Sequence, residues 1–326
     1  MIETQAAPPG YDRLASDVPW DSAYVEIVPP ERVTLLAEWG EDAAGPNAMS
    51  PVAITSPFRF LSDEAVGILQ AICAELEQDA GGDERIAKRV RGSIYRSEFL
   101  RGMYHDSAIV ELLRGLAQAP LAPHPVSHHA IHINYAPDDL ARNVDQWHRD
   151  VISFDYVLMV TDPRSMKGGR FQYFLGPVEE GKALLESGPG LPPERVVSAE
   201  FPGPGWAVLQ QGHRVLHRAA RLEERHERVT IVGSYWTPLA GVDDPTDLPT
   251  LLRVDPREVA LTEWSRFQAL VAARKLEDFA ETMTDFRRPL GDLQARLREI
   301  AAAVGDAAEA IDRAEEGRLI SFGAGS

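Results

Sequence analysis

The chain has 326 residues, of which 44% are hydrophobic and 25% charged, and its net charge at pH 7 is −17. That length is enough for one large domain or two small ones with a sizeable core. Such an acidic chain repels phosphate backbones and anionic lipid surfaces, so we expect neither a nucleic-acid nor a membrane partner. The single cysteine, Cys73, lies in an apolar helical pattern and is expected to be buried. Because no disulfide can form within the chain, we predict a cytoplasmic protein.

The N-terminal region opens with "MIETQAAPPGYD", which is polar and lacks the apolar core of a signal peptide. Residues 1–57 are rich in proline, alanine and acidic residues, and we expect an irregular arm with little regular structure. Amphipathic helices are predicted over 62–80, with Ser62 as the N-cap, and over 106–118, capped by Asp106 or Ser107. We assign residues 1–120 to this arm and its support helices.

From residue 128 the hydrophobic period changes to two. In "HHAIHINYA", Ile131 and Ile133 fall on one face, and His132 and Asn134 on the other. Turn signals such as "APDD", "DPRSMKGG" and "PGPG" separate several short runs of this kind. A series of short strands without helices between them is typical of an antiparallel barrel or jelly roll. We therefore predict a mainly β core over 121–245 with flanking helices (an α+β chain), with further strands at 152–161, 168–176, 195–201, 205–211 and 228–236.

Two helical segments accompany this core. Residues 177–194 read as a short helix followed by a Gly/Pro-rich loop, an insertion that is a candidate lid. Beyond residue 246, long helices are predicted at 261–283 and 290–317, the second with an apolar stripe that begins at Leu290. This C-terminal extension, 246–326, is a candidate homodimer interface. We expect the three regions to form one compact catalytic unit.

The tripeptide His-Arg-Asp at 148–150 has two interpretations. In a protein-kinase catalytic loop an asparagine follows five residues after the aspartate, but here that position is Asp155. No Gly-rich loop precedes the tripeptide and no Asp-Phe-Gly follows it, so the kinase interpretation fails.

The second interpretation is a metal site. Two histidines and one carboxylate on one face of an iron ion form the donor set of non-haem oxygenases. Residues two apart on a strand point the same way, so His148 and Asp150 are expected to face the interior of the barrel together. A chain with 9 histidines and 50 acidic residues contains such a pair by chance, so a third ligand must decide. A later strand offers His213, His217 and His226.

The order of features from residue 128 to 237 resembles the iron(II)/2-oxoglutarate-dependent oxygenase superfamily, in its prolyl-hydroxylase-like and phytanoyl-CoA-hydroxylase-like branches. The features are a strand with Tyr135, the His-x-Asp motif, Gly168-Gly169 opening a strand, the "PGPGWAVLQ" turn, a histidine, and Arg228 eleven residues after His217. The resemblance covers a third of the chain. It implies a double-stranded β-helix, the jelly roll of that superfamily.

The resemblance also implies a set of site residues. His148, Asp150 and His217 would bind Fe(II), with His213 as the alternative to His217 if the alignment shifts. The co-substrates would be 2-oxoglutarate and O₂, and the products succinate, CO₂ and a small molecule oxidised at a C–H bond. The far carboxylate of 2-oxoglutarate would be bound by Arg228, with hydroxyl groups from Thr230 and Tyr135.

The substrate is expected to be a free small molecule, an amino acid or a natural-product intermediate. Arg170 or Arg91 could pair with a substrate carboxylate. Two other functions stay open at this point: a metal-dependent jelly-roll enzyme that does not use 2-oxoglutarate, and a non-catalytic binding module. Candidate substrate contacts are His132, Asn134, Arg170 and Gln172.

Overall fold

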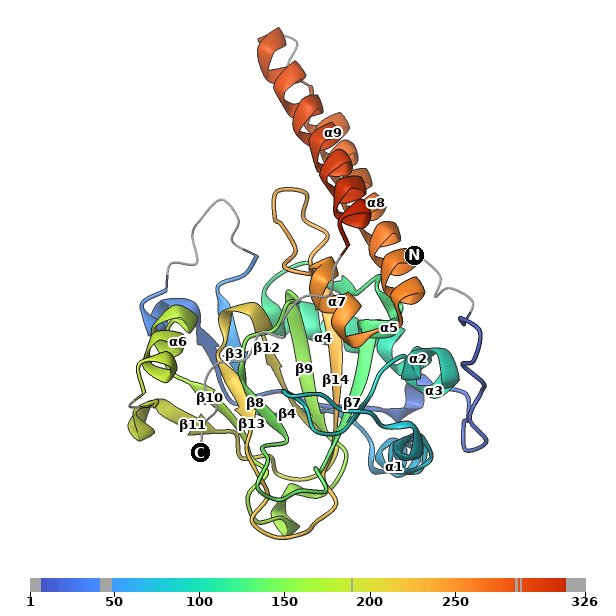
Figure 1. Ribbon diagram of the computed structural model, residues 1–326, viewed down its shortest axis with the longest axis vertical. Coiled ribbons are helices and arrows are strands. Elements are labelled where there is room, and N and C mark those ends of the chain that lie inside the picture. Colours follow the sequence, from blue (N-terminus) through green and yellow to red (C-terminus); the bar gives the residue numbers. More distant parts are fainter. Residues whose placement is uncertain (1–6, 42–48, 189, 285–286, 288, 315–326) are drawn as a thin grey trace.

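Two antiparallel β-sheets face each other at the centre of the structure (Figure 1). The computed structural model describes residues 7–41, 49–188, 190–284, 287 and 289–314. The major sheet runs β1-β4-β12-β9-β14-β7-β5, with β3 beside β12, β2 beside β3 and β6 beside β14. The minor sheet runs β11-β10-β13-β8. The strands are β1 (Val25–Val28), β2 (Val33–Leu35), β3 (Val52–Thr55), β4 (Phe58–Leu61), β5 (Arg89–Val90), β6 (Ala122–Pro123), β7 (Ile131–Tyr135), β8 (Asp145–His148), β9 (Phe154–Met159), β10 (Phe171–Phe174), β11 (Val196–Ser198), β12 (Trp206–Gln210), β13 (His217–Ala219) and β14 (Val229–Trp236).

The eight strands from β7 to β14 have the topology of a jelly roll. They form the rows β7-β14-β9-β12 in one sheet and β8-β13-β10-β11 in the other. The chain therefore crosses repeatedly from sheet to sheet, and the space between the sheets is lined by residues from both. The prediction of a jelly roll with flanking helices is confirmed.

Helices cover the outer face of the major sheet. Leu69 of α1, Phe99 of α3 and Leu113 of α4 belong to one apolar cluster with Phe58 and Ile133 of the sheet. The helices are α1 (Asp63–Leu76), α2 (Ser93–Arg96), α3 (Glu98–His105), α4 (Ser107–Ala117), α5 (Ser127–Ala130), α6 (Val178–Glu186), α7 (Leu248–Val254), α8 (Arg257–Thr282) and α9 (Leu290–Asp312), with six short 3₁₀ turns at 22–24, 36–39, 77–79, 163–165, 193–195 and 212–214 among the described residues.

Both predicted helix caps are present. The Ser62 side chain accepts the N–H of Ala65 at 3.3 Å, and the Asp106 carboxylate accepts the N–H of Ala108 at 2.9 Å. Each side chain satisfies a backbone donor that the first helical turn leaves without a partner.

The expectation of little regular structure up to residue 57 was wrong. Strands β1, β2 and β3 lie in that region and extend the major sheet through β4 and β12. They span only three or four residues each, and β3, "VAIT", is buried on both faces. A strand that is buried all round has no alternation, so its sequence carries no period-two signal.

The insertion at 177–194 lies away from the space between the sheets. Val178 of α6 packs with Trp147, Phe174 and Leu216 at the minor sheet. Its role as a lid remains a prediction.

The C-terminal helices α8 and α9 form a long hairpin that projects from the body (Figure 1). Leu290, Leu297 and Val304 of α9 are exposed, and the homodimer interface remains a prediction. Among the described helices, none is both long enough and apolar enough to cross a membrane.

A buried polar network ties α7 and α8 to the core. Asp255, which follows α7, accepts hydrogen bonds from both Nε and Nη2 of Arg91 and contacts Nδ1 of His128 at 2.7 Å. The Tyr11 hydroxyl lies 2.6 Å from Nε2 of the same imidazole. Glu263 of α8 accepts the backbone N–H of His128 at 2.8 Å. Burial raises the pKa of Glu263 from its ordinary value of 4.5 to about 7.

The raised pKa of Glu263 makes the stability of the fold depend on pH. Because the folded state binds the proton of Glu263 more tightly than the unfolded state does, the free energy of unfolding contains a favourable contribution from this proton. That contribution is fully present below pH 4.5 and is lost as the pH rises towards 7. Glu263→Gln removes this titration. We expect its free energy of unfolding to match the parent at pH 4.5 and to exceed it at pH 8 by up to about 3 kcal/mol. Urea unfolding at the two pH values measures this, and an equal difference at both would contradict it.

Candidate metal centre

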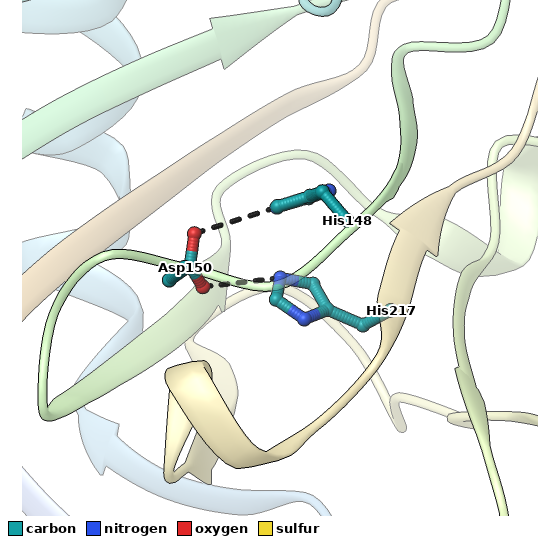
Figure 2. A group of neighbouring side chains, drawn as sticks. All are labelled: His148, Asp150 and His217. Atoms are coloured by element: carbon teal, nitrogen blue, oxygen red, sulfur yellow. Dashed lines mark ion pairs between the residues drawn. The ribbon is translucent and has the colours of Figure 1, made fainter. Parts of the chain in front are cut away.

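The three predicted ligands converge between the two sheets (Figure 2). One side-chain atom from each of His148, Asp150 and His217 lies within 4.8 Å of the others. Nε2 of His148 is 3.4 Å from Oδ1 of Asp150, and Nε2 of His217 is 3.2 Å from Oδ2. Two ligand atoms at right angles on a metal, with bonds of about 2.1 Å, lie about 3 Å apart. The two distances from Asp150 to the imidazoles therefore match the spacing of neighbouring ligands on one first-row metal ion.

The pairing of β8 with β13 positions the two histidines. His148 ends β8, His217 begins β13, and the two residues are direct partners in the register. Their ring centroids are 4.1 Å apart. The sequence did not delimit either strand, because each has four residues or fewer and mostly polar side chains.

Asp150 comes from the loop after β8. Its backbone N–H donates to the carbonyl of Gly212 at 3.0 Å, which fixes the loop beside β13. The expectation that His148 and Asp150 face the site together is met. The reason given for it, alternation along a continuing strand, is wrong because β8 ends at His148.

Backbone carbonyls orient both imidazoles. Nδ1 of His148 lies 2.6 Å from the carbonyl oxygen of Gln146, and Nδ1 of His217 lies 2.9 Å from that of Val215. With Nδ1 donating, the lone pair of each ring is on Nε2, the atom that faces Asp150. Burial also lowers the pKa of His148, which favours the neutral ring that a metal requires.

A second carboxylate, Asp155, lies beside Asp150. Burial and the charge of Asp150 raise the pKa of Asp155 well above its usual range. For Asp150 burial acts in the same direction, but the neighbouring imidazoles of His217 and His148 hold its pKa well below its usual range. Of the two carboxyl groups, Asp150 therefore holds its negative charge more readily than Asp155.

Gln210 connects these groups. Its Nε2 donates to Oδ1 of Asp155 at 2.9 Å and lies 3.4 Å from Oδ2 of Asp150. Neither Asp155 nor Gln210 was predicted as a site residue. The available signal was a carboxylate in the middle of the apolar run 152–161, since a buried charge needs a local reason.

The carboxylates of Asp150 and Asp155 occupy the space that a side chain at Gly212 would fill. A Cβ at this position would lie 2.7 Å from Oδ2 of Asp150 and still closer to Oδ2 of Asp155. Any side chain here would displace both carboxylates.

Arg228 shares a pocket with the three ligands. It precedes β14, is 1% exposed, and donates from Nε to the carbonyl of Gly169 at 2.7 Å. Gly169 has φ +65°, and a Cβ there would lie 3.0 Å from Cδ of Arg228. Burial lowers the pKa of Arg228 to about 10, so the guanidinium is still charged at pH 7.

This guanidinium has no carboxylate partner in the part of the chain that the structure describes. Its one hydrogen bond to another side chain among the described residues runs from Nη1 to Oγ1 of Thr230, at 3.5 Å. Thr230 pairs with Asn134 of β7, whose Oδ1 is buried without a hydrogen-bond partner among the described residues. An unpaired buried cation is costly, so the pocket is built to receive an anion. Four predicted site residues thus line the pocket with the ligands: His132, Asn134, Arg228 and Thr230.

Two predicted site residues lie elsewhere because of strand alternation. Tyr135 has the parity of Ile131 and Ile133, so it points into the helix-covered core and donates to the carbonyl of Cys73 at 2.8 Å. The buried position expected for Cys73 is observed. Gln172 of β10 bonds Ser198 at 3.0 Å, whereas its neighbour Phe171 faces the metal pocket.

Arg170 and His213 are also outside the pocket. The Arg170 side chain is 54% exposed and pairs with Glu200. Nδ1 of His213 lies 3.3 Å from the carbonyl of Ser153, and His213 is not part of the ligand cluster.

No protein-family model and no curated protein matches this sequence. Several solved structures are similar. The α-ketoglutarate-dependent carbocyclase SnoK from nogalamycin biosynthesis is 16% identical, with 64% of this chain and 87% of that chain covered and a TM-score of 0.44. The nickel complex of the non-heme monooxygenase ThoJ is 15% identical, with 83% of this chain and 99% of that chain covered and a TM-score of 0.43. A prolyl-4-hydroxylase of Pseudomonas putida is 15% identical, with 57% of this chain and 91% of that chain covered and a TM-score of 0.39.

Removal of one ligand should abolish tight metal binding. We expect His217→Ala and Asp150→Ala to weaken Fe(II) or Co(II) binding by at least about 100-fold. Mutation of a residue that only orients a metal ligand already lowers the metal affinity about 10–100-fold. His213→Ala should leave the affinity unchanged. Anaerobic calorimetry measures all three, and a loss in His213→Ala with none in His217→Ala would assign the ligand to His213.

A methyl group at position 212 should disturb the same site. We expect Gly212→Ala to weaken metal binding by about 10-fold or more, since it displaces the carboxylates of Asp150 and Asp155. Gly67→Ala in α1 is the matched control, because a Cβ there meets no atom within 4 Å. Equal metal affinity in both variants would show that the carboxylates move without consequence.

Proposed function

We propose that this protein is an iron(II)- and 2-oxoglutarate-dependent oxygenase that oxidises a C–H bond of a small molecule. One observation carries the proposal: a donor set of two imidazoles and one carboxylate shares a buried pocket with an arginine that has no carboxylate partner among the described residues. The donor set suits a non-haem iron with open coordination positions. The arginine suits an anionic co-substrate in the same space.

The residues present fit the metal. Nε2 of His148, Nε2 of His217 and the carboxylate of Asp150 would hold the ion, and no other described side chain is needed. Bound iron(II) would supply activation of O₂, coupled to oxidative decarboxylation of 2-oxoglutarate to succinate and CO₂ and to oxidation of the substrate. Asp150 is the one carboxylate of this donor set, so the set would add a single negative charge and leave the ion electrophilic.

The residues also fit the co-substrate. The planar guanidinium of Arg228 can bind a carboxylate through two parallel hydrogen bonds. Thr230, on the same face of β14, can add a hydroxyl donor. Both are buried between the sheets, so the salt bridge would form away from water, where it is strongest.

The two rival functions explain less of the site. A jelly-roll enzyme that uses the metal alone has no need of a buried cation in the metal pocket. A non-catalytic binding module has no need of imidazoles that backbone carbonyls hold with Nε2 towards one point.

The proposal predicts specific 2-oxoglutarate chemistry. Anaerobic protein with Fe(II) should develop a visible metal-to-ligand absorption band when 2-oxoglutarate is added, and admission of O₂ should release succinate. Arg228→Gln should raise the 2-oxoglutarate concentration needed for half-maximal band intensity by about 10- to 100-fold, the loss of a charged hydrogen-bonded pair.

The control is Arg170→Gln, which removes an exposed arginine and should leave the band unchanged. Absence of both the band and succinate from iron-loaded protein would overturn the oxygenase proposal. Metal binding without either would favour the enzyme that uses metal alone.

A further inference from the structure

A second pocket adjoins the metal pocket. Arg85, His132 and Asp150 line both, so the two spaces meet at the metal ligand. The second pocket encloses about 510 Å³, including the part open to solvent. Its polar lining is basic: Arg85, Arg89, Arg91, His129 and His132.

The carboxylates that pair with these arginines lie behind the lining. Arg89 pairs with Asp83 and Arg91 with Asp255, and neither aspartate lines the pocket. Asp150, a metal ligand, is the one carboxylate in the lining among the described residues. The basic groups therefore face the space, in a chain whose net charge is −17.

Arg85 is the least satisfied of the three arginines. Its side chain is 12% exposed and its Nε lies 3.2 Å from Oδ1 of Asp145, yet it donates no hydrogen bond to any described residue. Burial lowers the pKa of nearby Arg89 to about 10, so the Arg89 guanidinium is still cationic at pH 7. A guanidinium buried with unused N–H groups is a donor set for an oxyanion.

The two histidines add unsatisfied polar atoms. Nδ1 of His129 lies 2.8 Å from Nη2 of Arg91, so Nδ1 accepts and Nε2 carries the proton. That Nε2 is buried without a hydrogen-bond partner, as is Nδ1 of His132. Burial, followed by the charge of Arg91, holds the pKa of both rings well below the usual range, which favours the uncharged imidazoles.

The opposite side of the pocket is apolar. Val151 and Ile152 come from the loop that follows Asp150, and Leu251 and Val254 come from α7. An occupant that fits has an anionic end and an apolar body.

We propose that this pocket binds the primary substrate, and that the substrate is a small carboxylic acid whose carboxylate is bound by Arg85 and Arg89 while its apolar part lies against Ile152, Leu251 and Val254. This inference rests on the proposed oxygenase function. Each arginine already shares its charge with one aspartate, so a singly charged carboxylate matches the pocket better than a dianion. Substrate bound here would reach the metal on the Asp150 side.

The test uses hexanoate and hexanamide, which differ in charge but scarcely in shape. Dissociation constants are measured by ligand-observed NMR on full-length protein loaded with Zn(II) and saturating 2-oxoglutarate. We expect hexanoate to bind at least about 10-fold more tightly than hexanamide. Arg85→Gln and Arg89→Gln should each remove most of this preference, whereas Arg170→Gln, at an exposed arginine, should keep it.

Melting temperatures show whether each variant is folded. Arg85→Lys is the second variant at that position, and it should retain part of the preference because it retains the charge without the planar fork. Equal binding of the two probes, or a preference that survives both Arg→Gln changes, would overturn the proposal. So would hexanoate that competes with 2-oxoglutarate and responds to Arg228→Gln instead, because that would place it in the metal pocket.

A separate measurement shows whether the proposed oxygenase function fails. It appears as the absence of the Fe(II)–2-oxoglutarate band in the parent protein. The preference for hexanoate can then still be measured in Arg228→Gln without 2-oxoglutarate, so the two proposals stand or fall on different readings.

Discussion

The site depends on the pairing of two very short strands. When β8 and β13 pair, His148 and His217 become direct neighbours, and the loop that leaves β8 brings Asp150 to the same point. The rest of the jelly roll serves this pairing by holding the minor sheet against the major one. A shift of one residue in the register would turn one imidazole out of the site, because neighbouring residues on a strand face opposite sides. The donor set is thus a property of strand register as much as of residue type.

Buried arginines line the space between the sheets although the chain as a whole is acidic. The chain carries a net charge of −17, yet Arg228, Arg85 and Arg89 are largely buried around the space between the sheets. Arg85 and Arg89 have an aspartate each, whereas Arg228 has no carboxylate partner among the described residues. These three guanidinium groups would attract a small anion that enters the space, since low-dielectric walls focus the field.

Sequence patterns predicted the features that show a hydrophobic period, a capping residue or a fixed order of motifs. The jelly roll, the caps at Ser62 and Asp106, the ligands and Arg228 all followed from alternation, capping chemistry and motif order. Strands β1 to β3 were missed and the bounds of β8 and β13 could not be predicted, because these strands are too short or too uniformly buried to show a period. Tyr135 was misplaced although its parity with Ile131 was readable. Arg85 and Asp155 act through neighbours far away in sequence, and a linear pattern cannot show such contacts.

The buried salt bridge between Arg91 and Asp255 has a consequence for how proteins with this fold could diversify. It fastens α7 beside the metal centre, so Leu251 and Val254 of the C-terminal extension form part of the wall of the second pocket. The metal ligands and Arg228 lie on the jelly roll, whereas this wall is carried by a separate, later element. Mutations in α7 can therefore change which molecule is accepted while the candidate metal centre stays intact, which makes the extension a module for evolving or engineering selectivity.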